Sequence, residues 1–199
     1  MHASFPLGVS APRADFLKRS ALVGGAALAV GALAGAPGAL RAQGGGDARA
    51  LDLLLLVEYT EDAFYSEAVA RANLTAELRD FAVQVAEQER EHLQFVKDAL
   101  GSRAASRPDF DFGDSTRSPE AFAAAAARLE DLAVSAYNGQ ATNVSRKTLG
   151  AAATIVSVEA RHAAWVRSIA GEPPAPDATD AGMKADAVLD ALAEIGLRR

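Results

Sequence analysis

A weak internal repeat constrains the fold of this 199-residue chain more than any other feature. In the first copy, Glu58 is followed seven residues later by Tyr65, and the segment Glu89-Arg-Glu-His92 comes about thirty residues after Glu58. The second copy repeats this order with Glu130, Tyr137, Glu159 and His162. Seven residues make two helical turns, and residues three apart share a face. Each copy therefore predicts a helical hairpin that carries these side chains on one face.

Long stretches without glycine or proline predict the helices of these hairpins. Ser118 and Pro119 form a typical helix start, and Gly101 and Gly139 are expected to end helices. The polar stretch 102–117 is too long for a tight turn, which predicts an extended connection between the second and third helices. We expect helices over 47–73, 75–100, 119–138 and 142–170, then a Pro-rich linker and a short amphipathic helix over 185–195.

The composition agrees with an all-α fold. Aromatic residues make up only 6% of the chain and alanine supplies much of the apolar fraction, which favours closely packed helices over a β-sandwich. Two helical pairs joined by one long connection predict a four-helix bundle with a long crossover between helices 2 and 3. We divide the chain into a leader over 1–43, the bundle over 44–170, and a linker with a short C-terminal helix over 171–199.

The N-terminal segment has the layout of an export signal. A basic stretch at 13–19 precedes an Ala/Gly/Leu-rich run over 21–40, and small residues follow. Phe16-Leu17-Lys18 resembles the end of a twin-arginine export motif, although position 14 holds alanine where that motif has its second arginine. We expect cleavage within 36–43 and a periplasmic or other extracytoplasmic location. The alternative is an uncleaved membrane anchor; after cleavage we expect no stable membrane span.

Charge and cysteine content exclude several classes of function. The chain has no cysteine, so it forms no disulfide, zinc ribbon, Cys-ligated cluster or catalytic thiol. Its formal net charge of −6 argues against a nucleic-acid partner, because nucleic-acid binders carry a basic face. Removal of the basic leader makes the remaining domain more acidic still.

The glutamates of the repeat fall on apolar helix faces, which points to a metal site. Glu58, for example, shares a face with Leu51, Leu54 and Leu55. A carboxylate turned into an apolar core is costly unless it is paired or bound to metal, and four converging carboxylates attract two divalent cations. Carboxylates and imidazoles suit iron or manganese, so we expect two iron ions, or manganese as the alternative. The predicted metal ligands are Glu58, Glu89, His92, Glu130, Glu159 and His162.

Two assignments stay open at the level of sequence. Glu61 lies one turn after Glu58 and is its rival as a ligand, but Glu61, like Glu87 and Glu91, is expected to be a solvated residue or the partner of a nearby arginine. Tyr65 and Tyr137 are either plain core aromatics or donors of hydrogen bonds to the ligand carboxylates.

The ligand order Glu, Glu-x-x-His, Glu, Glu-x-x-His resembles that of the ferritin-like superfamily of di-iron and di-manganese bundles. This resemblance implies that Glu89 and Glu159 bridge the metals while Glu58 and Glu130 are terminal ligands. More narrowly, the segments Leu56-Val57-Glu58-Tyr59, Asp109-Phe110-Asp111-Phe112-Gly113, Leu129-Glu130-Asp131 and Ser135-Ala136-Tyr137 are similar to those of exported ferritin-like proteins related to plant desiccation-associated proteins.

Three classes of function fit these observations. The first is redox chemistry of the metal pair with O2 or peroxide, of the ferroxidase, peroxidase or manganese catalase type. A rubrerythrin-type electron relay within the chain is excluded, because the rubredoxin module needs four cysteines. The second is iron storage in an oligomeric cage, which makes a homo-oligomer possible. The third is a non-enzymatic structural or stress-associated envelope protein in which the site only stabilises the bundle.

Overall fold

The computed structural model describes residues 45–71 and 73–198, and over these residues the chain is an all-α bundle. Five α-helices occur in this part of the chain: α2 (Gly45–Arg71), α3 (Ala76–Leu100), α4 (Pro119–Gln140), α5 (Arg146–Ile169) and α6 (Ala185–Ile195). The predicted all-α fold with a short C-terminal helix is therefore confirmed. The predicted leader over 1–43 lies outside the described residues. Among the helices that the structure describes, none combines the length and the apolar character that crossing a bilayer requires.

Local capping sets three of the helix boundaries. Gly101 ends α3 with a φ of 61°, a conformation that glycine adopts without strain. The Ser118 side chain accepts a hydrogen bond from the Ala121 amide at 3.2 Å, which caps α4 as its sequence predicted. The Ser145 side chain caps α5 in the same way, so that helix begins at Arg146 and not at residue 142.

The predicted helix end at Gly139 is wrong, because α4 continues to Gln140. Gly139 serves a close approach of two backbone segments. A Cβ atom at this position would lie 1.9 Å from the carbonyl oxygen of Met183, in the segment that leads into α6. The Met183 amide also donates a hydrogen bond to the Ser135 carbonyl at 2.8 Å. The glycine therefore allows the C-terminal segment to lie directly on α4.

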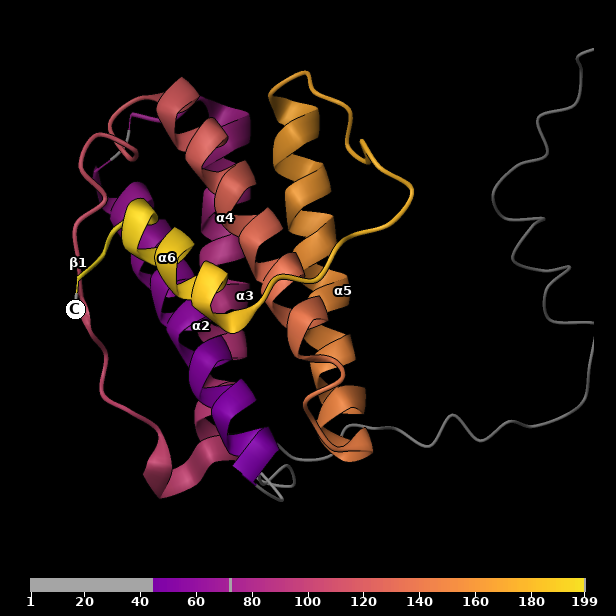
Figure 1. The fold of residues 1–199 in the computed structure, drawn as a ribbon. Coiled ribbons are helices and arrows are strands. Elements are labelled where there is room, and N and C mark those ends of the chain that lie inside the picture. The colour runs from indigo at the N-terminus through magenta and orange to yellow at the C-terminus, as the bar shows by residue number, and fades with distance from the viewer. Residues whose placement is uncertain (1–44, 72, 199) are drawn as a thin grey trace, which may run out of the picture. The chain divides into compact units, whose positions relative to one another are not determined.

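The four long helices form two antiparallel pairs (Figure 1). Helix α2 pairs with α3, and α4 pairs with α5, while α2 also contacts α4 and α3 contacts α5. The connection from α3 to α4 runs along the bundle from one end to the other, so that α3 and α4 run in the same direction. This order places the first copy of the sequence repeat on one hairpin and the second copy on the other.

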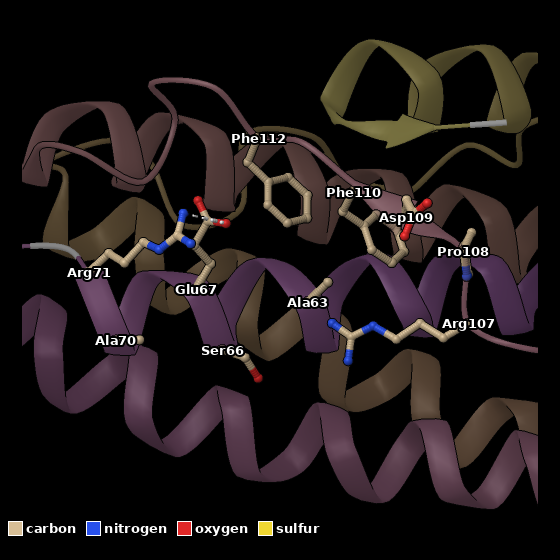
Figure 2. Close-up of a pocket in the computed structure, with 10 residues that line it drawn as sticks. All are labelled: Ala63, Ser66, Glu67, Ala70, Arg71, Arg107, Pro108, Asp109, Phe110 and Phe112. Carbon is tan, nitrogen blue, oxygen red and sulfur yellow. Dashed lines mark ion pairs between the residues drawn. The ribbon is translucent and has the colours of Figure 1, made fainter.

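The crossover is attached to α2 along its length. The Tyr59 hydroxyl donates to the Ala105 carbonyl at 3.0 Å, and Arg107 forms an ion pair with Asp62 at 3.2 Å. A surface cavity of about 520 Å³ lies between α2 and the crossover and is drawn in Figure 2. Phe110 and Phe112 line it from the crossover side, and no residue of the sequence repeat lines it.

The C-terminal segment holds the crossover in place. Helix α6 contacts α2 and α4 through the fully buried side chains of Val188 and Leu192. A two-residue strand, β2 (Leu197–Arg198), pairs antiparallel with β1 (Asp109–Phe110) in the crossover. This short pairing was not predicted from the sequence. It joins the end of the described chain to the middle of the bundle's long connection.

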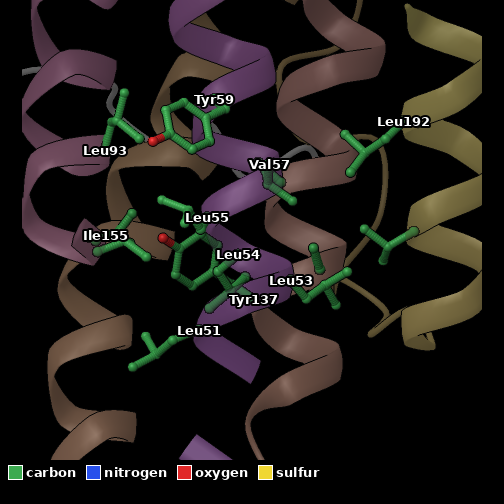
Figure 3. Close-up of a cluster of buried hydrophobic side chains, with 14 of the residues drawn as sticks. Leu51, Leu53, Leu54, Leu55, Val57, Tyr59, Leu93, Tyr137, Ile155 and Leu192 are labelled. Atoms are coloured by element: carbon green, nitrogen blue, oxygen red, sulfur yellow. The ribbon is translucent and has the colours of Figure 1, made fainter. Parts of the chain in front are cut away.

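The bundle interior consists of two hydrophobic clusters. One gathers leucines of α2 with Ile155 and Leu192, and it includes Tyr137 (Figure 3). The other is aromatic and includes Phe64, Tyr65 and Phe81. The hydroxyls of Tyr65 and Tyr137 meet buried carboxylates, so each cluster borders the polar group described next.

Candidate metal centre

Each of the four long helices brings one glutamate of the repeat into the bundle interior. Glu58 on α2, Glu89 on α3, Glu130 on α4 and Glu159 on α5 all have 0% exposed surface. Carboxylates are rarely buried completely unless their charge is compensated. The helical pattern that places leucines inside therefore also carries four acidic groups into a core where water does not reach them.

The two histidines lie among these carboxylates. Nδ1 of His92 is 3.1 Å from Glu89 Oε2 and 2.8 Å from Glu159 Oε1. Nδ1 of His162 is 3.0 Å from Glu89 Oε1, 3.3 Å from Glu159 Oε2 and 3.4 Å from Glu130 Oε2. The six predicted ligand residues thus come together from four helices.

The six residues form two overlapping groups of potential metal ligands. One consists of Glu58, Glu89, His92 and Glu159, and the other of Glu89, Glu130, Glu159 and His162. Within each group, one donor atom from every residue lies within 4.8 Å of the others. Glu89 and Glu159 belong to both groups. Sharing two carboxylates between two positions is the arrangement expected of residues that lie between a pair of cations.

Several buried oxygen and nitrogen atoms of this cluster lack hydrogen-bond partners within the described chain, which indicates that cations fit here. Among the described residues, every buried side-chain polar atom without a hydrogen-bond partner belongs to this cluster or to the neighbouring Glu61. The free atoms include Nδ1 of His162, which is close to three carboxylates but aligned with none, and both oxygens of Glu159. Unpaired buried groups are costly, and these are oxygen and nitrogen donors suited to iron or manganese.

The two tyrosines of the repeat hold the outer glutamates across the bundle. Tyr65 on α2 donates a hydrogen bond to Glu130 Oε1 on α4, and Tyr137 on α4 donates one to Glu58 Oε1 on α2. Each hairpin therefore orients the glutamate of the other. Burial, together with the adjacent carboxylates, raises the pKa of both tyrosines well above 10, so both hydroxyls keep their protons and remain donors.

One further orienting contact was missed by the sequence analysis. Nε2 of His162 lies 2.6 Å from Oε1 of Gln88 on α3, and this hydrogen bond leaves Nδ1 to face the carboxylates. Partners of this kind fix the ring orientation of metal-binding histidines. No sequence signal marks Gln88, because a half-exposed glutamine beside a glutamate is ordinary on a helix.

Electrostatics indicate where the metal-free cluster holds its protons. Burial disfavours the imidazolium forms, but the adjacent carboxylates raise the pKa of His92 to about 11 and that of His162 to about 12. Burial and the Glu89 charge raise the pKa of Glu130 to about 8. Burial acts in the same direction on Glu159, yet both imidazoles together lower its pKa to about 2. A cation that enters must therefore displace protons.

The expectation that Glu61 is solvated or paired with an arginine is wrong. Glu61 has 0% exposed surface, and neither of its carboxylate oxygens has a hydrogen-bond partner among the described residues. The nearby Arg90 and Arg107 instead pair with Asp62, the next residue on α2. Burial, followed by repulsion from Glu89, raises the pKa of Glu61 well above its usual value. Glu87 and Glu91 are exposed as expected.

Comparison with known proteins agrees with this architecture. The family model of the ferritin-like domain matches residues 46–172, which is well over half of the chain and includes all six residues of the two ligand groups. The resemblance to the superfamily is therefore confirmed, while the narrower similarity to desiccation-associated proteins stays a prediction. No protein of curated function matches this chain.

Proposed function

Because this chain belongs to the ferritin-like domain family, we propose that it binds a dinuclear iron or manganese centre and performs redox chemistry with O2 or peroxide. The observation that carries the proposal is the pair of ligand groups that share Glu89 and Glu159 in an interior where their oxygens lack other partners. Glu58 and His92 complete one metal position, and Glu130 and His162 complete the other.

A pair of iron or manganese ions, when bound, supplies electrons two at a time to a reactant such as peroxide. The protein's own residues prepare the place where this happens. Tyr65 and Tyr137 fix Glu130 and Glu58 by hydrogen bonds, and Gln88 fixes the ring of His162. The aromatic and aliphatic clusters on either side exclude water, which strengthens these interactions.

The cavity next to His92 supports the proposal that the reactant is a small molecule. The His92 side chain is 12% exposed, whereas the side chains of the other five residues are at most 3% exposed. Its ring borders a cavity of about 380 Å³ between α3 and α5, and Phe95, Thr154 and Ile155 also line this cavity. This cavity opens beside the cluster and is large enough to admit O2 or peroxide.

The export signal expected from the sequence adds a location to the proposal. A leader over 1–43 would carry the domain to the periplasm or another extracytoplasmic space. There the centre would meet peroxide and O2 arriving from outside the cell. This part of the proposal depends only on the N-terminal sequence pattern.

Elemental analysis of the protein, purified without chelators or a metal-affinity step, tests the metal centre. We expect about two iron or manganese ions per chain. The double variant His92→Ala/His162→Ala should lose stoichiometric metal and keep its helical circular dichroism. Glu91→Gln, an exposed change on the same helix as His92, is the matched control and should keep both ions. Two retained ions in the double variant would refute the ligand assignment.

The reaction is then tested with the protein loaded with each metal. Oxidation of added Fe(II) by O2 indicates ferroxidase activity, and release of O2 from hydrogen peroxide by the manganese form indicates catalase activity. If the wild-type chain binds neither metal after anaerobic reconstitution, the proposed redox function is wrong. The bundle would then be a structural scaffold.

A further inference from the structure

The buried carboxylate of Glu61 is not explained by the six-residue centre. It lies one helical turn after Glu58 on α2, it has 0% exposed surface, and both of its oxygens lack hydrogen-bond partners among the described residues. Tyr137 holds Glu58, but no tyrosine or histidine hydrogen bond holds Glu61 in the described chain. An ionised carboxylate is costly to bury without a donor or a cation, so a bound cation would stabilise the charged form of Glu61.

A structural ion pair does not account for Glu61. The arginines near this part of α2 are used by the neighbouring Asp62, which lies 3.2 Å from Arg107 and 4.0 Å from Arg90. Glu61 is also no member of the internal repeat, because the corresponding position of the second copy is Ala133, a fully buried apolar residue. The fifth buried carboxylate is therefore an addition to one half of the site.

The charge of the bound cations determines whether the additional carboxylate of Glu61 improves the charge balance of the site. The four carboxylates of the repeat carry four negative charges, which match the charge of two divalent cations. A fifth carboxylate adds negative charge in excess around a divalent pair. Around two trivalent cations, four carboxylates leave an uncompensated positive charge in a low-dielectric interior, and a fifth reduces it.

We propose that Glu61 is a fifth carboxylate ligand of the centre and that it selectively stabilises trivalent over divalent cations. The proposal rests on the proposed dinuclear site and adds to it a residue that sets the preferred charge of the metal pair. The electrostatic repulsion on Glu61 comes first from Glu89 and Glu159, the two carboxylates that both ligand groups share.

Redox-inert ions test the proposal without measuring activity. The affinities of Zn²⁺ and of Ga³⁺, each buffered with nitrilotriacetate, are measured for the wild type and for Glu61→Gln, which keeps the shape of the side chain but removes its charge. We expect Glu61→Gln to bind Zn²⁺ within about threefold of wild type and to bind Ga³⁺ at least about tenfold more weakly. The matched control is Glu87→Gln, an exposed glutamate on α3, which should change neither affinity.

Glu58→Gln is the comparison that separates this role from ordinary ligation, since it should weaken binding of both ions. Equal losses for Zn²⁺ and Ga³⁺ in Glu61→Gln, or no loss for either, overturn the proposal. Failure of the wild type to bind Zn²⁺ at all overturns the dinuclear centre itself, which is a distinct result. If circular dichroism shows that Glu61→Gln does not fold, the same measurements on Glu61→Leu, which introduces no polar atom, decide the question.

Discussion

The affinity of the centre for divalent metal should rise steeply with pH. The carboxylates around His92 and His162 raise the pKa of these imidazoles to about 11 and about 12, so both rings are protonated in the metal-free protein at neutral pH. A metal bound through Nδ1 must displace one proton from each ring. Lowering the pH therefore favours the protonated, metal-free form, and raising it favours the metal-bound form.

The size of this effect follows from the number of protons displaced. A pH between 6 and 8 is well below the pKa values of both imidazoles, so both rings are protonated in the metal-free protein. Metal binding therefore releases two protons from the histidines at every pH in this range. Burial also raises the pKa of the ligand Glu58 well above its usual value, so at least two protons are released, and the apparent binding constant for the loaded centre rises by at least about a hundredfold per pH unit, or about 2.7 kcal/mol. Glu130, with a pKa of about 8, adds to this dependence at the lower end of the range.

Isothermal titration calorimetry with Mn²⁺ measures the effect directly. Titrations in buffers of different ionisation enthalpy give the number of protons released, and chelator competition at several pH values gives the slope. We expect at least two protons for the wild type and about one fewer for His92→Gln. An affinity that does not change between pH 6 and 8, or a titration that releases no protons, would refute the protonation state derived for this cluster.

Three other predictions follow from single contacts and from the leader. Tyr137→Phe removes the donor to Glu58 and should weaken metal binding about tenfold in chelator competition, with unchanged helicity; equal affinity would contradict an orienting role. Leu192→Ala removes most of a fully buried side chain of α6 and should lower the free energy of unfolding, measured with urea, by about 2–5 kcal/mol. An unchanged free energy of unfolding would mean that α6 is not packed against the bundle. Mass spectrometry of the protein from its native cells should find a mature N-terminus within 36–44; a chain that keeps the Ala/Gly-rich run would contradict cleavage.

The sequence was sufficient for the bundle because its strongest signals are local and periodic. Long stretches without helix breakers, the Ser118-Pro119 start and the polar crossover fix the number and order of the helices. The repeat was equally informative about the site. Residues spaced by three and by seven on amphipathic helices must share the inward face, and the structure brings all six of the predicted ligands together there.

The remaining features depend on contacts between segments that are distant in the chain. Gly139 reads locally as a helix end, and only the approach of Met183 explains why a glycine continues the helix there. From the sequence Glu61 is expected at the surface, as a solvated residue or the partner of a nearby arginine, yet Arg90 and Arg107 pair with Asp62. Neither the spacing nor the composition of the sequence shows whether Glu61 or the adjacent Asp62 pairs with the arginines.

The internal repeat is strict for the ligand residues and is broken in the residues that support them. Gln88 precedes Glu89 and holds His162, but the corresponding residue before Glu159 is Val158, which has no group to hold His92 by a hydrogen bond. Among the described residues, none hydrogen-bonds Nε2 of His92, and that ring borders the surface cavity between α3 and α5. The two halves therefore hold their histidines unequally. The ring of His162 is enclosed and is held by Gln88, whereas the ring of His92 lies beside the cavity, so in the proposed centre the His92 side is the one open to a small reactant or an exchanging ion.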